Sequence, residues 1–368
     1  MRERNDLIKK IYILKECLNF PLTQRILDNA GKIPWEIIEN KHELGEEIRT
    51  SEDPLKEGKK ILLLARQKGK FVKSCPCTPN YIRCNYSIIN LALNCPLDCS
   101  YCILQGYLKD PFLIIHVNLE DLWKELDVYL EKRKHIKVRI GTGELADSLA
   151  LDLICECSKE LITYFRKKKN AILEFKTKTL NISHLLSLEP SSNIVFSWSL
   201  NSEKVAAEEE KGAPSIRERL EVASRISEIG FPVGFHFDPL IHYPGWEEDY
   251  ERVVRALFER IDPSRIAWIS LGCLRFPPRL KEIIHRRFPS TKIIYEEFIP
   301  GLDNKMRYFR LLRLRIYRKI VQLIRNLGGR KIPLYFCMEN ESIWKEIFNW
   351  VPKGEEIEMF LSSPPSFS

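Results

Sequence analysis

The sequence of 368 residues lacks a long run of apolar residues. Its unbroken apolar runs span only a few residues, as at 61–65, which excludes a segment long enough to cross a bilayer as a helix. Residues 1–6 carry mixed charge and no apolar core, so no secretory signal is predicted. No repeat of fixed period and no low-complexity tract is present, which excludes a repeat architecture. We therefore expect a cytoplasmic protein with no membrane partner.

The chain also lacks an even number of cysteines, since it has 11. An odd number in a reducing compartment argues against a disulfide framework, and clustered cysteines there more often bind metal. The apolar fraction of 44% and the charged fraction of 29% are ordinary for a globular protein that buries a core without disulfides. A net charge of +8 is compatible with a nucleic-acid partner and equally with a solvated basic surface.

Strand-like and helix-like segments alternate through the middle of the chain. The predicted strands are 86–94, 112–117, 137–141, 171–177, 193–200, 231–237 and 265–271, and the predicted helices are 119–132, 149–167, 215–229, 246–261 and 278–287. Such alternation predicts parallel strands joined by helical crossovers. About six βα units are fewer than the eight of a closed barrel, so the expected fold is α/β, a partial (βα)6 TIM-like barrel. Its reactive groups should gather at the carboxyl ends of the strands.

Three regions are expected along the chain. Residues 1–85 should form an N-terminal α/β region with a helix near 6–17, residues 86–300 the partial barrel, and residues 301–368 a basic C-terminal helical region. Between 305 and 331 lie ten Lys or Arg residues and no Asp or Glu, with apolar residues every three or four positions. This helix can follow a phosphate backbone, or its charges can simply form a solvated face. Its basic residues include Arg307, Arg310, Arg313, Arg315, Arg318 and Lys319.

One motif points directly to chemistry. Cys95, Cys99 and Cys102 form a C-x3-C-x2-C arrangement after an apolar strand. Three thiolates from one turn can bind three irons of a cubane and leave the fourth iron open to a small molecule. The spacing, with Tyr101 just before the last cysteine, is the signature of radical S-adenosylmethionine (SAM) enzymes. A structural zinc site, which would need a fourth ligand, and three unrelated core cysteines are the alternatives.

A glycine-rich turn ends the next predicted barrel strand. It reads Gly141-Thr142-Gly143-Glu144. Glycine permits a close backbone approach and a carboxylate pairs with an amine, so Gly143 and Glu144 are candidates to receive the ammonium group of SAM. A glycine-rich turn after a strand is also common without any ligand.

The chain resembles the spore photoproduct lyase family of radical SAM proteins from its N-terminal region to about residue 340. The resemblance rests on segments of matching sequence around and after the cysteine motif. These segments are 95–108, 115–119, 175–178, 198–202 and 234–250, the last with a Pro-Gly-Trp-Glu core.

The resemblance implies a [4Fe–4S] cluster, SAM and an external electron donor. It places Lys178 and Ser199 at positions that contact SAM, with Asn201 at the same strand end. Enzymes of the family repair a methylene-linked thymine dimer in DNA: SAM is cleaved to a 5′-deoxyadenosyl radical, and a cysteine later returns a hydrogen atom. DNA is therefore the expected partner. RNA, protein or metabolite substrates, and a non-enzymatic iron–sulfur or DNA-binding protein on this scaffold, are the alternatives.

The sequence departs from the family at the hydrogen-donor cysteine. Alignment places Glu144 there, and a carboxylate cannot donate a hydrogen atom as a thiol does. Tyr101 is retained, and with Cys273, which ends a predicted barrel strand, it makes up the expected catalytic pair. For Cys273 the alternative is a thiol packed in the core.

Further residues carry two interpretations each. Cys75, Cys77 and Cys84 can ligate a second metal or form a packing loop over the cluster, whereas Cys155 and Cys157 fall on different faces of a helix and should pack in the core. His236 and Asp238 lie on the same side of a strand, so they can line the substrate cavity or form a structural pair.

Overall fold

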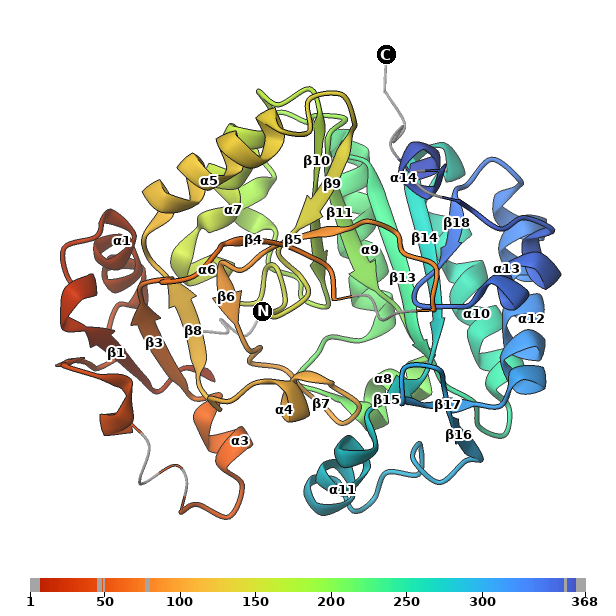
Figure 1. The fold of residues 1–368 in the computed structure, drawn as a ribbon, viewed down its shortest axis with the longest axis horizontal. Coiled ribbons are helices and arrows are strands. Elements are labelled where there is room, and N and C mark those ends of the chain that lie inside the picture. Colours follow the sequence, from red (N-terminus) through yellow and green to blue (C-terminus); the bar gives the residue numbers. More distant parts are fainter. Residues whose placement is uncertain (1–6, 45–47, 49, 77–79, 354–355, 362–368) are drawn as a thin grey trace.

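The computed structural model describes residues 7–44, 48, 50–76, 80–353 and 356–361 (Figure 1). Its main feature is a curled eight-stranded sheet in the order β18-β14-β13-β11-β10-β9-β5-β4, in which all neighbours are parallel except β4 and β5. The strands are β4 (Val72–Ser74), β5 (Ser87–Ile89), β9 (Val138–Gly141), β10 (Ala171–Thr177), β11 (Ile194–Ser199), β13 (Val233–Leu240), β14 (Ile266–Cys273) and β18 (Leu334–Phe336). The expectation of a partial α/β barrel is confirmed.

Helices α5–α10 and α12–α14 lie around the outside of this sheet, whereas α11 lies at one end of the barrel (Figure 1). They are α5 (Leu119–Glu131), α6 (Asp152–Cys155), α7 (Cys157–Phe165), α8 (Glu203–Glu209), α9 (Ile216–Ile229), α10 (Trp246–Arg260), α11 (Pro278–Arg287), α12 (Arg310–Gly328), α13 (Glu341–Phe348) and α14 (Glu356–Leu361). No helix in the described ranges is both long and apolar enough to cross a membrane. The predicted helix 149–167 is two helices, because Glu156 has a φ of 48° and breaks the helical hydrogen bonding between α6 and α7.

The barrel strands alternate in polarity. On β10, Leu173 and Phe175 are buried in the apolar core, whereas Glu174 and Lys176 face the inside of the barrel. Side chains of a strand point alternately to its two faces, so a strand of this pattern carries one apolar and one polar row. The interior of this open barrel is consequently a polar cavity rather than a packed apolar core.

A second sheet stands beside the barrel (Figure 1). Its order is β2-β1-β3-β8-β6, parallel except for β6 and β8. The strands are β1 (Lys10–Leu14), β2 (Trp35–Ile38), β3 (Ile61–Ala65), β6 (Ala92–Leu93) and β8 (Leu113–His116), and the helices of this region are α1 (Pro21–Ala30) and α3 (Pro54–Gly58).

Strand pairing crosses both predicted region boundaries. The segment 6–17, predicted as a helix, contains β1, whose Ile11 and Ile13 are buried between neighbouring strands and helices. β6 and β8, which sequence periodicity assigned to the barrel, instead extend the N-terminal sheet, and β18 of the C-terminal region completes the barrel. Boundaries at 85 and 300 therefore do not separate structural units.

Candidate active site

A cavity of about 300 Å³ opens at the carboxyl ends of the barrel strands. Side chains from the cysteine motif form one wall, and side chains from β10, β11, β13, β14 and the segment after β18 form the others. Its size and its mixture of apolar walls with convergent polar groups are typical of a small-molecule site.

The three motif cysteines all line this cavity. Their loop is shaped by β7 (Asp98–Cys99), which pairs antiparallel with β12 (Glu210–Lys211), and by α4 (Leu104–Tyr107) directly after the third cysteine. Among the described residues, no group of three His, Cys, Asp or Glu side chains is arranged to hold a single metal ion. A zinc ion takes all of its ligands itself, whereas a cubane takes each of its cysteine ligands on a different iron.

The thiols of the motif are held in a desolvated setting. Burial raises the pKa of Cys99 to about 12, against the opposing effect of Lys178, and burial raises the pKa of Cys95 further still. A buried neutral thiol binds metal by exchanging its proton for the ion. Two such sulfurs, with the sulfur of Cys102 on the same cavity wall, fit an iron–sulfur cluster.

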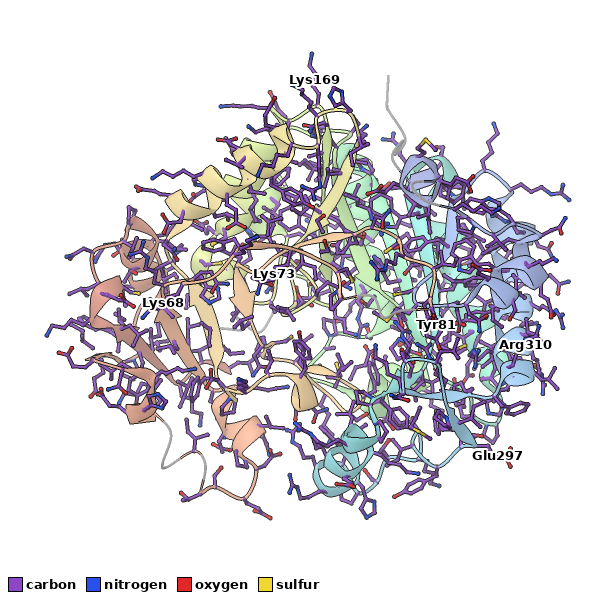
Figure 2. The ribbon with its side chains drawn as sticks, in the orientation of Figure 1. Lys68, Lys73, Tyr81, Lys169, Glu297 and Arg310 are labelled. Carbon is purple, nitrogen blue, oxygen red and sulfur yellow. The ribbon has the colours of Figure 1, made fainter. Side chains whose placement is uncertain are left out.

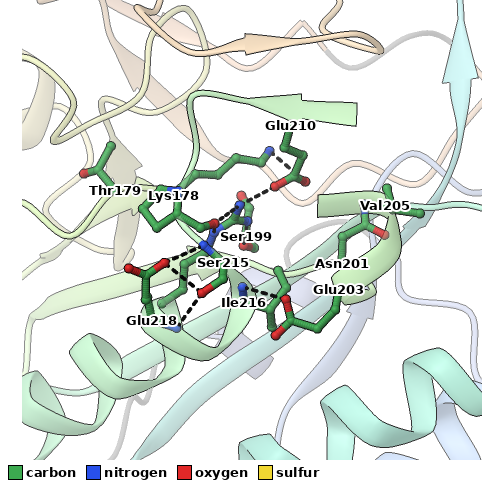
Figure 3. Close-up of polar contacts among 12 residues, drawn as sticks. Lys178, Thr179, Ser199, Asn201, Glu203, Val205, Glu210, Ser215, Ile216 and Glu218 are labelled. Atoms are coloured by element: carbon green, nitrogen blue, oxygen red, sulfur yellow. Dashed lines mark hydrogen bonds and ion pairs between the residues drawn. The ribbon is translucent and has the colours of Figure 1, made fainter. Parts of the chain in front are cut away.

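Lys178 directly follows β10 and points towards Glu210 (Figure 3). Its Nζ lies 3.8 Å from Glu210 and 5.4 Å from the ring centre of Tyr101. The Tyr101 hydroxyl donates to Glu210, and Arg219 of α9 donates to the same carboxylate and, at 2.9 Å, to the carbonyl oxygen of Ser199. Burial alone would raise the pKa of Glu210, but Lys178 and Arg219 hold it below its usual value. Tyr101, Lys178 and Ser199 thus share one rigid wall beside the cysteines.

Glu144 and Gly143 line the cavity after β9. Glu144 is bound by Lys176, whose pKa is raised by this carboxylate against the effect of burial. Gly143 permits the close approach of Lys176 on the neighbouring strand. A Cβ atom at position 143 would lie 2.8 Å from the Cβ of Lys176. Packing against the neighbouring strand therefore explains why a glycine occupies this position.

Two predicted site residues lie outside the cavity. Asn201 is buried, its Nδ2 donates to the carbonyl of Pro239 at 3.0 Å, and its Oδ1 accepts from the hydroxyl of Tyr250. Asn201 therefore fixes the strand end, and it does not line the cavity. Ser270 of β14 and Leu274, directly after it, line the cavity, whereas Cys273 faces the opposite side towards Tyr317. The alternation of the strand thus corrects the placement of Cys273.

Several cavity groups were missed from the sequence because the partners come from distant strands. Arg139 of β9 is buried between the rings of Tyr86, Trp268 and Tyr335, at 4.9–5.0 Å from each ring centre. Arg275 donates to both oxygens of Asp238, at 2.8 and 3.0 Å, and to the sulfur of Cys337 at 3.3 Å. Lys305 completes this side. The alternate polar residues along each strand were the only sequence signal that could have indicated these cavity groups.

Of the two open interpretations of His236 and Asp238, the structure supports the first, since both residues line the cavity, whereas Asp238 is paired with Arg275 rather than with His236. The His236 ring contacts Ser270 at 2.6 Å and Glu174 at 2.8 Å.

The remaining cysteines divide between cavity and core. Cys75, Cys84 and Cys337 line the cavity, while Cys155 and Cys157 are buried away from it, as expected for core packing. Cys77 lies outside the described residues.

The basic helix α12 lies on the outer side of the barrel, where Figure 2 marks Arg310. The six basic residues singled out from the sequence all form ion pairs within the chain. The pairs are Arg307–Asp303, Arg310–Glu346, Arg313–Glu339, Arg315–Glu247, Arg318–Glu346 and Lys319–Glu251. Acidic side chains from α10 and α13 thus offset part of the charge of a helix that looks strongly basic in sequence, with Glu346 shared between Arg310 and Arg318.

The sequence model of the family described as spore photoproduct lyase matches residues 7–316. The chain belongs to the spore photoproduct lyase family. The lyase of Geobacillus sp. (strain Y412MC61) is 26% identical over 296 residues, covering 78% of this chain and 85% of the relative. That of Bacillus subtilis (strain 168) is 28% identical over 298 residues, covering 78% and 84%.

Solved structures of spore photoproduct lyase have the same fold. One mutant form gives a TM-score of 0.80 at 23% identity, covering 90% of this chain and 99% of that chain. A double mutant with bound AdoMet and dinucleoside spore photoproduct gives 0.79 at 24% identity over the same shares. Membership of the spore photoproduct lyase family makes this chain a radical SAM enzyme of the lyase type.

Proposed function

We propose that this lyase-family enzyme acts on a thymine lesion in DNA, using a [4Fe–4S] cluster on Cys95, Cys99 and Cys102. The observation that supports it most is that the three cysteines line one cavity together with Lys178 and Ser199. The curated relatives carry the name spore photoproduct lyase, and one solved relative holds AdoMet with a dinucleoside spore photoproduct.

Different side chains of the cavity would hold the two cofactors. The cysteine loop would hold the cluster, and Lys178, Ser199 and the Gly143–Glu144 turn are the neighbouring polar groups that would receive SAM. Bound together, the cluster and SAM supply one-electron cleavage of SAM and hence radical chemistry.

The chain's own residues position and shield these groups. Tyr101 is buried, with its hydroxyl fixed on Glu210, so its ring forms a permanent wall beside the cysteines. On the far side Arg275 and Asp238 hold each other, and Lys305 adds a cation, which favours a substrate with anionic groups. A base in duplex DNA must leave the stack to reach such an enclosed site.

Anaerobic reconstitution followed by substrate turnover tests this function. The reconstituted enzyme, SAM and a one-electron reductant are incubated with UV-irradiated DNA that contains the dimer, and with unirradiated DNA as the control. We expect repaired thymine, measured by mass spectrometry, only from irradiated DNA. Cleavage of SAM without any change in the DNA would point to an RNA, protein or metabolite substrate. A chain that binds the cluster but leaves SAM intact would be a non-enzymatic member of the family.

A matched pair of variants tests the ligand set. Cys99→Ala removes a thiol from the cavity wall and should lower the iron and sulfide content of the reconstituted protein severely. Cys155→Ala removes a buried thiol of α6 and should leave that content unchanged. Equal iron in both variants would contradict the proposed ligands.

A further inference from the structure

Buried charged side chains from outside the barrel contact the cysteine loop. Asp98, the residue before the second cysteine, accepts hydrogen bonds from two cations that lie far apart in sequence. Lys59 Nζ lies 2.8 Å from Asp98 Oδ1, and Arg287 Nη2 lies 3.1 and 3.0 Å from the two carboxylate oxygens. The side chains of Lys59 and Arg287 are only 8% and 4% exposed.

Arg287, the last residue of α11, links the loop to its surroundings. Its Nε lies 2.9 and 3.0 Å from the oxygens of Asp53, and its Nη1 donates to Gln105. Gln105 in turn donates to the carbonyl of Ser100 at 2.8 Å, inside the cysteine motif. Arg287 therefore braces the loop from the side of α11.

Lys59 reaches the loop from the N-terminal region. It follows α3, and besides Asp98 its ammonium group donates to the carbonyl oxygen of Leu97 at 2.5 Å. Both acceptors belong to the loop between Cys95 and Cys99, so this one ammonium group fixes backbone and side chain of the same turn.

The charge of Lys59 also acts on the sulfurs. Its ammonium group lies against the turn that joins Cys95 and Cys99, on the carbonyl oxygen of Leu97 and the carboxylate of Asp98. A cation that favours negative charge on these sulfurs also favours an added electron on a cluster that they ligate. Net charge and nearby charged groups are among the factors that set the potential of such clusters.

We propose that Lys59 is a positioning residue of the cysteine loop that raises the reduction potential of the cluster bound there. The N-terminal region thereby contributes to the electron-accepting site. This inference depends on the proposed cluster, which accepts one electron from an external one-electron donor.

The test compares Lys59→Met with Lys60→Met as the matched control, because Lys60 forms a more exposed pair with Glu57. Iron and sulfide contents are measured first, and the cluster is then titrated with reductant and followed by electron paramagnetic resonance. At the wild-type midpoint potential, Lys59→Met should show about a tenfold lower ratio of reduced to oxidised cluster. For a one-electron couple this is a midpoint ~59 mV more negative. Lys60→Met should match the wild type, and Lys59→Arg should restore most of the shift.

A second variant keeps the proposal testable if Lys59→Met does not retain the cluster. Asp98→Asn leaves both cations in place and removes a negative charge, so its midpoint should move in the positive direction. Unchanged potentials in both variants, or shifts of the same sign, would refute the role of Lys59. A wild-type chain that binds no iron after reconstitution would instead refute the proposed function.

Discussion

Glu174 is the carboxylate around which the interior of the barrel is organised. Its Oε1 accepts from Ser197 Oγ at 2.6 Å, His236 at 2.8 Å and Trp268 Nε1 at 2.9 Å, so side chains of three other strands meet on one atom. Burial alone would raise the pKa of Glu174, but His236 and Arg139 hold it well below its usual value. The ionised form is thus part of the folded structure.

We expect Glu174→Gln to lower the free energy of unfolding by about 3 kcal/mol at pH 7, because it leaves Arg139 without a buried counter-charge. The folded-state pKa of Glu174 is depressed, so its contribution is complete above the pKa of the unfolded chain. It disappears as the pH falls through the folded-state value. Urea titrations at several pH values should show the difference between wild type and variant shrinking below about pH 4.

The exposed pair partner Glu57 provides the control for this experiment. Glu57→Gln should change the unfolding free energy by less than about 0.5 kcal/mol at any pH. A deficit of Glu174→Gln that stays constant into acid would show that the ionised carboxylate is not what stabilises the fold.

Cys273 belongs to the other face of its strand, which leads to a prediction about reactivity. Because its sulfur packs towards Tyr317 in the core, Cys273→Ala should leave the reaction products unchanged and cost about 1 kcal/mol of stability. Alkylation of the native protein should spare Cys273, because burial raises the pKa of its thiol. Altered products in Cys273→Ala, or rapid labelling of its thiol, would restore it as a candidate donor.

At the scale of elements, local signals predicted structure well wherever they were self-contained. The helix predicted at 215–229 is α9, whose start is fixed by a capping box between Ser215 and Glu218 and whose end follows from Gly230, with a φ of 113° (Figure 3). The predicted helix near 6–17 failed because the buried Ile11 and Ile13 are paired in a sheet with distant strands. Strand pairing between distant segments gives no signal in the local sequence.

The capping box makes a measurable contribution. Ser215→Ala removes the acceptor for the backbone N–H of Glu218 and should lower the unfolding free energy by about 1 kcal/mol. Ser215→Asp keeps a capping oxygen and should recover most of the loss. Since Ser215 is exposed, binding of SAM should be the same in both variants. A loss of SAM affinity with Ser215→Ala would mean that α9 transmits strain to the wall carrying Ser199.

Across the whole molecule, sequence indicated the cysteine loop but not the partners of the charged groups. Cys95, Cys99 and Cys102 are neighbours in sequence, so their spacing alone identified the loop. The polar groups opposite them could not be predicted, because Arg139, Asp238 and Arg275 meet only when the sheet curls. The acidic partners of the six basic residues associated with α12 could not be predicted for the same reason, because they lie elsewhere in the chain.

This distribution of charge predicts how DNA affinity should respond to mutation and salt. Arg315 and Arg318 are about three-fifths exposed, but each is already paired with a glutamate of the chain. The double variant Arg315→Gln/Arg318→Gln should therefore keep the wild-type affinity for DNA and the wild-type slope of log K against log salt. Lys305 lines the cavity and its ion pair with Asp303 is long, at 3.7 Å, so Lys305→Gln should weaken binding. Fluorescence anisotropy with a labelled duplex at several salt concentrations measures both. Removing a cation that binds a phosphate reduces the slope by about one, so a slope reduced by about two in the double variant would place the DNA on α12 after all.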